Sequence, residues 1–145
     1  MRRLFIIRKD LHLTPGKLAA MVAHCSEGYW TNLINHNASE IDGKITTSFE
    51  IDKDIFEEYL NGSFTKTICE AKNLYQLLKA KDLAMKLGLE QDKDFGIIED
   101  CCKTELTPEF VDEEGIGYCT VGIWFKPLSD DMAHLISKKY QLYKS

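Results

Sequence analysis

Apolar and polar positions along the chain follow two patterns, short continuous apolar runs and longer stretches with helical spacing. The run at residues 4–7 is continuous, as in a strand buried on both faces, and further strands are predicted at residues 66–71, 95–98 and 118–124. The helical stretches lie at residues 15–34, 73–87 and 129–139, and we expect Thr14 and Ser129 to cap the first and the last of them. This alternation predicts an α/β fold with three layers (α/β/α), a mixed sheet of about four strands covered by helices on both faces.

A polar segment at residues 36–53 interrupts this alternation. Within it, the run Ile45–Phe49 predicts a short extra strand. After it, Asp54–Leu60 predicts a short helix that ends at a following Asn-Gly. We interpret the polar segment as an insertion within one domain that spans residues 1–145.

Composition limits the class of protein. With 145 residues, of which 44% are apolar, the chain can bury one sizeable core. No stretch approaches the roughly 20 apolar residues of a membrane span, and the run Leu4–Ile7 is too short for a signal peptide, so we expect a cytoplasmic protein. The five cysteines lack the spacing of a disulfide framework or a zinc site, which predicts free thiols. A net charge of −5 argues against a generic nucleic-acid binder, so any such site must be a local basic patch.

Lys17 lies in the first turn of the first predicted helix, where the helix dipole disfavours a cation by about 0.3–1 kcal/mol. Four apolar residues recur at helical spacing as a core-facing stripe: Leu18, Val22, Cys25 and Tyr29. The same spacing places Lys17, Met21 and His24 in line beside that stripe. With Arg8 at the end of the preceding strand, the free amides of this helix N-terminus suit an anion such as phosphate. The alternative is that Lys17 pairs with Asp10 or simply points into water.

A second polar group follows the apolar strand predicted at residues 95–98. It consists of Asp100, Lys103 and Thr104. Ligands of open α/β sheets bind beyond the carboxyl ends of the strands. This group and Arg8 therefore share one edge of the sheet if their two strands run parallel.

The two segments contain three short motifs in a specific order. These are RKDL at residues 8–11, GKLAAMVAH at residues 16–24 and DCCKTE at residues 100–105. They resemble the Arg-x-Asp-Leu, Gly-Lys-x-Ala-Ala-Gln-x-x-His and Asp-Ala-Gly-Arg-Thr-Gln motifs of the archaeal- and eukaryotic-type class of peptidyl-tRNA hydrolase. Further on, Lys66 resembles the lysine that begins that family's next strand, and Thr120 or Cys119 resembles a threonine of its last strand. The resemblance covers nearly the whole chain except about residues 36–53 and 106–116.

The resemblance implies hydrolysis of the ester that joins a peptide to the 3′ ribose of tRNA, which releases free tRNA, without a metal or other cofactor. It implies that Asp100 orients or deprotonates the attacking water and that Thr104 fixes the water or the carbonyl. Lys17 is then the cation that faces the oxyanion or the terminal phosphate. His24 is a further catalytic candidate, placed to hold Asp10 or the loop.

Other residues are expected to contact the substrate. Arg8, Lys66 and Lys103 would line the path of the tRNA backbone as point charges for phosphate. The complete expected substrate-binding set is Arg8, Asp10, Met21, Lys66, Lys103, Glu105 and Thr120.

Departures from the motifs keep other functions open. Met21 replaces a glutamine and cannot bond a substrate in the same way, while Glu105 replaces another glutamine with a charge that repels phosphate. A non-catalytic binding domain and an esterase with another substrate are the alternatives. The pair Cys101-Cys102 beside a lysine leaves thiol chemistry as a further one. The sequence does not give the oligomeric state, and a homodimer is among the possibilities.

Overall fold

The computed structural model describes residues 1–103 and 105–144. The main sheet consists of β1 (Arg2–Arg8), β4 (Thr65–Ala71), β5 (Phe95–Asp100), β6 (Phe110–Val111), β7 (Gly117–Phe125) and β8 (Gln141–Leu142). The other elements are α1 (Pro15–His36), β2 (Ala38–Ile41), β3 (Lys44–Thr47), a π-helix (Ile55–Ser63), α2 (Leu74–Lys86) and α3 (Asp130–Ser137). Over the residues described, no helix combines the length and the apolar character needed to cross a membrane.

β1 lies at the centre of the sheet, whose strand order is β5-β7-β1-β4-β8, with β6 paired to β7. β1 runs parallel to β4 and antiparallel to β7, and β5 also runs antiparallel to β7. The sheet is therefore mixed, as predicted, and β1 and β5 run in the same direction. The four long strands correspond to the four predicted strands, whereas the two-residue strands β6 and β8 gave no apolar run of their own.

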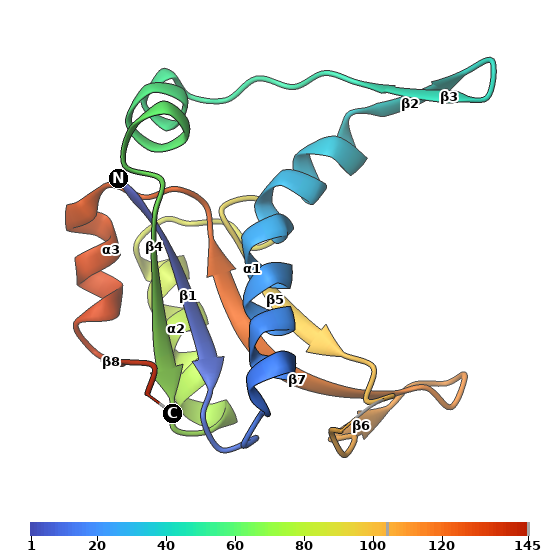
Figure 1. Cartoon of the computed structure of the whole chain (residues 1–145), viewed down its shortest axis with the longest axis vertical. Coiled ribbons are helices and arrows are strands. Elements are labelled where there is room, and N and C mark those ends of the chain that lie inside the picture. The colour runs from blue at the N-terminus through green and yellow to red at the C-terminus, as the bar shows by residue number, and fades with distance from the viewer. Residues whose placement is uncertain (104, 145) are drawn as a thin grey trace.

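Helices cover both faces of the sheet (Figure 1). α1 packs on one face with Phe5 and Ile7 of β1, while α2 and α3 pack on the other with Leu4 and Ile6. Alternate side chains of β1 thus enter two separate cores, because successive residues of a strand point to opposite faces. The three-layer α/β/α architecture confirms the predicted fold class.

The buried stripe of α1 differs from the prediction. Its buried residues are Met21, Cys25 and Tyr29. Leu18 and Val22, which the sequence pattern placed on the inner stripe, are only partly buried, and Met21, which it placed beside the stripe, is 2% exposed. The reason is the position of α1, which packs chiefly over β7, β1 and β5 and leaves its flank towards β4 open.

The polar segment forms a hairpin rather than a single strand. β2 and β3 pair antiparallel around Asp42 and Gly43, whose φ angles of 53° and 74° suit a tight hairpin turn. The predicted strand Ile45–Phe49 is thus shifted to Lys44–Thr47 and has a partner in Ala38–Ile41. Figure 1 shows that this hairpin projects from the end of α1, away from the main sheet.

The short helix predicted at Asp54–Leu60 is present, but with π-helical hydrogen bonds over Ile55–Ser63. Ile55 and Tyr59, one turn apart, are its buried residues. Gly62 has non-helical φ and ψ angles. The residue that ends the predicted helix therefore coincides with a distortion of the backbone.

The direction of the strands determines which side chains meet. Arg8 and Asp100 are the last residues of β1 and β5, so both lie at the edge that we call the carboxyl edge. α1 begins at the same edge, because the chain turns there directly after β1. The predicted condition for bringing the two polar groups together, parallel β1 and β5, is therefore met.

Candidate active site

Lys17 and Asp100 form an ion pair at the carboxyl edge. The Lys17 ammonium donates to Asp100 Oδ1 at 2.8 Å, and the two side chains are only 13% and 10% exposed. Lys17 therefore neither pairs with Asp10 nor points into water. A helix N-terminus and a strand end together hold a cation and a carboxylate in a site that is largely screened from solvent.

The chain after β5 turns back onto Asp100. The second carboxylate oxygen of Asp100 accepts the backbone N–H of Cys102 at 3.0 Å, and Cys102 has a φ of 59°. This hydrogen bond fixes the orientation of the carboxylate that faces Lys17. Thr104, the third predicted catalytic residue, lies outside the described residues.

Glu105 is held at the beginning of α1. Its carboxylate accepts the Thr14 hydroxyl at 2.7 Å and the Thr14 backbone N–H at 3.2 Å, while Thr14 caps the helix by accepting the N–H of Lys17. Glu105 was expected to contact substrate. In this structure its charge instead lies next to the helix N-terminus, the position that we expected an anionic ligand to take.

Arg8, which was predicted to contact the phosphates of tRNA, is buried and links several segments of the chain by hydrogen bonds. Its side chain is 5% exposed, and its guanidinium donates to both oxygens of Asp10 and both oxygens of Glu109. It also donates to the backbone carbonyl of Thr120 at 2.9 Å. Burial lowers the pKa of Arg8, but the hydrogen bonds to the two carboxylates outweigh it and raise the pKa above its usual value. Arg8 and Asp10 thus join β1 to β7 and to the segment before β6.

The pairing of β5 with β7 bears on the choice between Cys119 and Thr120. Asp100 lies opposite Cys119, and Glu99 lies opposite Thr120, with a bulge next to this pair. Residues directly opposite each other share a face of the sheet, so Cys119 lies on the same face as Asp100. Thr120, 9% exposed, enters the Arg8 network through its backbone, donating its N–H to Glu109 and accepting from Arg8.

Glu109 is the residue at this edge that sequence reasoning missed. It accepts from Arg8 and from Thr120, and the Cys119 thiol lies 3.5 Å from its Oε1. Together with burial, its charge raises the pKa of Cys119 to about 12. It belongs to the stretch where no motif was found, and only the pairing of β6 with β7 brings it here.

The two remaining lysines differ in position. Lys66 lies near the start of β4, opposite Arg3 of β1, and therefore at the other edge of the sheet, which we call the amino edge. Its ammonium donates to the Phe64 carbonyl and lies 3.3 Å from the centre of the Phe64 ring. Lys66 therefore lies far from the Lys17–Asp100 pair, because parallel pairing puts the start of β4 far from its end. Its contact with the tRNA backbone stays a prediction. Lys103 is exposed in the loop after β5.

Met21 and His24 do not extend the Lys17 site. Met21 is buried in the core beneath α1, so substrate cannot reach it in this conformation. His24 is exposed, and among the described residues no hydrogen bond or ion pair connects it to Asp10, which Arg8 holds instead. Of the three residues predicted in line along α1, only Lys17 therefore lies at this site.

The chemistry available at the carboxyl edge is that of a cation and a carboxylate. Burial and the charge of Asp100 raise the pKa of the Cys102 thiol above its usual value, the opposite of what a nucleophilic thiol needs. Within residues 1–103 and 105–144, no three His, Cys, Asp or Glu side chains are grouped so as to hold a metal ion. The pair can stabilise a negative oxygen with Lys17 and orient or deprotonate a water with Asp100.

Comparison with known proteins identifies the family of this chain. A model of the family described as Peptidyl-tRNA hydrolase PTH2 matches residues 1–143. The peptidyl-tRNA hydrolase of Saccharolobus islandicus is 28% identical over 117 residues, which cover 81% of this chain and 85% of that protein. The peptidyl-tRNA hydrolase of Methanopyrus kandleri is 31% identical over 116 residues, covering 80% and 83%. The chain therefore belongs to the peptidyl-tRNA hydrolase PTH2 family.

Proposed function

We propose that this protein hydrolyses the ester between a peptide, or an N-blocked amino acid, and the 3′ end of tRNA. The observation that carries the proposal is the Lys17–Asp100 pair, 2.8 Å apart and almost enclosed, at the sheet edge where α/β proteins bind ligands. Family membership points to the same reaction. The cytoplasm, where translation produces peptidyl-tRNA, is the location that we propose.

In the proposed mechanism, Asp100 positions and deprotonates a water. Each of its oxygens already accepts one bond, from Lys17 and from Cys102, and each keeps a further lone pair for the water. The water oxygen attacks the ester carbonyl carbon, and its proton passes to the carboxylate. The carbonyl oxygen becomes an oxyanion, which the Lys17 ammonium stabilises. When the tetrahedral intermediate collapses, the C–O bond to ribose breaks and the ribose oxygen receives the proton from Asp100.

We further propose that Thr104 fixes the water or the carbonyl, as the family motif implies. Three lysines at the carboxyl edge are proposed to contact the tRNA backbone. Lys9 follows β1, Lys72 follows β4 and Lys103 follows β5. They would supply the local positive charge that an acidic protein needs, with Lys9 also 3.7 Å from Glu70, so substrate binding should weaken as salt is raised.

The test is release of N-acetyl-amino acid from N-acetyl-aminoacyl-tRNA by the purified protein. Lys17→Ala and Asp100→Asn should each lower kcat/KM by about 100-fold or more, because each removes a group that acts in the transition state. Lys126→Ala is the matched control, since Lys126 forms a comparable pair with Asp94, at 2.9 Å, at the amino edge. Equal turnover by Lys17→Ala and the control would contradict the assigned site.

The same assay separates the alternatives. No turnover by the wild-type protein at any salt concentration, with retained binding of tRNA, would indicate a non-catalytic binding domain. Turnover of small aminoacyl esters with none of N-acetyl-aminoacyl-tRNA would indicate another esterase. A homodimer is still a prediction, which light scattering coupled to size-exclusion chromatography tests.

A further inference from the structure

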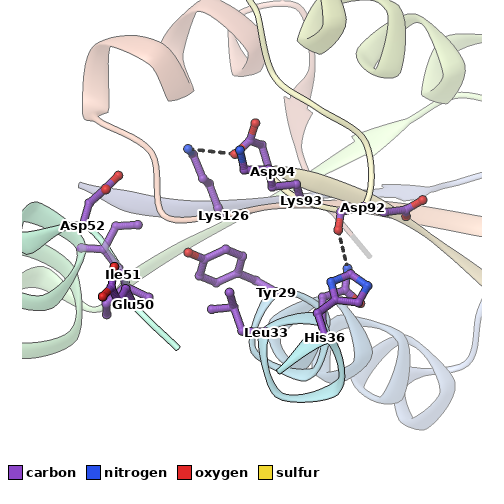
Figure 2. Close-up of a pocket in the computed structure, with 12 residues that line it drawn as sticks. Tyr29, Leu33, His36, Glu50, Ile51, Asp52, Asp92, Lys93, Asp94 and Lys126 are labelled. Carbon is purple, nitrogen blue, oxygen red and sulfur yellow. Dashed lines mark hydrogen bonds and ion pairs between the residues drawn. The ribbon is translucent and has the colours of Figure 1, made fainter. Parts of the chain in front are cut away.

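A cavity of about 340 Å³ lies at the amino edge, opposite the Lys17–Asp100 site (Figure 2). Its walls come from four segments: the second half of α1, the chain just before the π-helix, the turn before β5 and the residue after β7. Its volume is within the range of pockets that bind small organic molecules. None of the residues assigned to hydrolysis contributes to it.

Tyr29 of α1 provides the first sign of a ligand. The residue is only 7% exposed, yet across the described chain no hydrogen bond reaches its hydroxyl. Figure 2 shows the hydroxyl pointing into the cavity, between Asp52 and Lys126. The ring of Tyr29 is buried, whereas its hydroxyl oxygen stays accessible from the cavity, since no described side-chain N or O atom is both fully buried and without a partner. A ligand in the cavity that supplies a partner for this hydroxyl would satisfy Tyr29.

The charged side chains around the cavity indicate the sign of the charge on that ligand. Lys126 is paired with Asp94 at 2.9 Å, and Lys93 lies 3.6 Å from Glu90. The other lining carboxylates have no ion-pair partner among the described residues, and they belong to Glu50, Asp52 and Asp92. The cavity therefore has an excess of negative charge.

The carboxylates act on Tyr29 directly. Burial, then the charges of Asp52 and Asp94, raise the pKa of its hydroxyl above the ordinary value of 10.0, although Arg3 opposes them. The phenol therefore stays protonated and faces carboxylates from two different segments. A cation placed between these groups would be stabilised by them.

The arrangement favours an organic cation over a metal ion. No group of three metal-ligating side chains exists here or elsewhere in the described chain. Leu33, Ile51 and Ile55 supply an apolar wall that would contact an aliphatic stem. We propose that this cavity binds an amine or guanidinium group on a short aliphatic stem, with Asp52 and the Tyr29 hydroxyl as its polar partners.

The insertion contributes one wall of this site. Ile51 and Asp52 follow the β2–β3 hairpin and belong to residues 36–53, the segment to which the family motifs do not extend. The site is thus built partly from chain outside those motifs and does not depend on the proposed hydrolysis. The cation can come from a free small molecule or from an arginine or lysine side chain of another protein.

The test is a titration with butylguanidine, followed by NMR of the tyrosine ring signals, with butylurea as the neutral probe of the same shape. Butylguanidine should shift the Tyr29 signals, identified by their loss in Tyr29→Phe, and butylurea should bind at least fivefold more weakly. Asp52→Asn should weaken butylguanidine by about tenfold or more, as expected for one hydrogen bond to a charged partner. Glu58→Gln, the same charge change on an exposed residue of the π-helix outside the cavity, should have no effect.

Two further arms complete the experiment. An Ac-Gly-Arg-Gly amide peptide that binds more tightly than butylguanidine would identify a protein side chain as the source of the cation, and weaker binding would identify a free molecule. Lys17→Ala should bind butylguanidine like the wild type, which keeps this site distinct from the hydrolytic one. Equal binding of butylguanidine and butylurea, no saturable shift of Tyr29, or no effect of Asp52→Asn would each overturn the proposal.

Discussion

Arg8→Lys tests whether Arg8 stabilises the fold through its hydrogen bonds or contacts tRNA. The guanidinium makes bonds to Asp10 on one side and to Glu109 and the Thr120 carbonyl on the other. A lysine keeps the positive charge, but its three N–H donors sit on one compact nitrogen, so it cannot reproduce the guanidinium fork that reaches Asp10 on one side and Glu109 on the other. The substitution therefore removes the hydrogen bonds that link these segments, while it preserves the positive charge that would attract a phosphate.

The size of the effect follows from the bonds that are lost. Loss of two hydrogen bonds to charged groups, at about 1.5 kcal/mol each, gives about 3 kcal/mol. The side chains of Asp10 and Glu109 are 36% and 31% exposed and would be partly rehydrated. We therefore expect the free energy of unfolding to fall by about 2 kcal/mol, which corresponds to about 1 M in the urea midpoint.

Urea unfolding at pH 7 measures this stability, and the salt dependence of kcat/KM measures the tRNA contact. Arg2→Lys is the matched control on the same strand, because Arg2 is 38% exposed, and it should leave the urea midpoint unchanged. Lys103→Ala should reduce the slope of log kcat/KM against log salt concentration by the amount expected for about one phosphate contact, and it should leave the stability unchanged. An Arg8→Lys protein with wild-type stability would refute the reasoning, since the substitution keeps the charge and removes only the guanidinium bonds.

Three further substitutions test other parts of the fold. Gly28→Ala should lower the free energy of unfolding, measured with urea, by about 1–3 kcal/mol, because a Cβ there would overlap the indole ring of Trp124. Gly16→Ala is the control and should not be destabilising, because a Cβ there meets no atom within 4 Å. Met21→Gln should cost about 1–3 kcal/mol of stability without raising kcat/KM, since its amide would be buried without a partner; an active, fully stable variant would contradict the burial of this residue. Burial raises the pKa of Cys25 from 9.0 to about 12, so the unfolded chain loses this proton first as the pH rises. Stability should therefore be complete below pH 9 and fall by up to about 1.4 kcal/mol per pH unit between pH 9 and 12, and Cys25→Ala measured by urea unfolding in reducing buffer should flatten this decline.

The sequence predicted the elements that carry strong local signals. The four predicted strands are the four long strands of the sheet, and the capping residues Thr14 and Ser129 begin α1 and α3 as expected. The convergence of Lys17 with Asp100 was also accessible, because it depends only on strand direction and on the edge where ligands bind. These predictions rest on backbone chemistry that acts within a few residues.

The failures concern the orientation and the partners of side chains. Lys66 was included among the substrate-binding residues because of a family motif. A residue at the start of a strand parallel to β1, however, must lie at the amino edge. Arg8 looked like a free charge because its partner Glu109 is distant in sequence and belongs to no motif. Met21 turned inward because the tilt of α1 over the sheet, which no periodicity encodes, decides which flank is buried.

The central position of β1 has a consequence for how the protein folds in the cell. β1 is synthesised well before β7, yet the two are neighbours in the sheet: Phe5 pairs with Trp124, and the Arg3 side chain donates to the Phe125 carbonyl. Until β7 has been synthesised, a strand that is buried from Arg3 to Arg8 in the native state keeps that edge open. Pairings so distant in sequence form slowly, and open apolar strand edges promote aggregation during that time. The completion of the sheet is therefore a late step, in which β1 must meet a strand more than a hundred residues further along the chain.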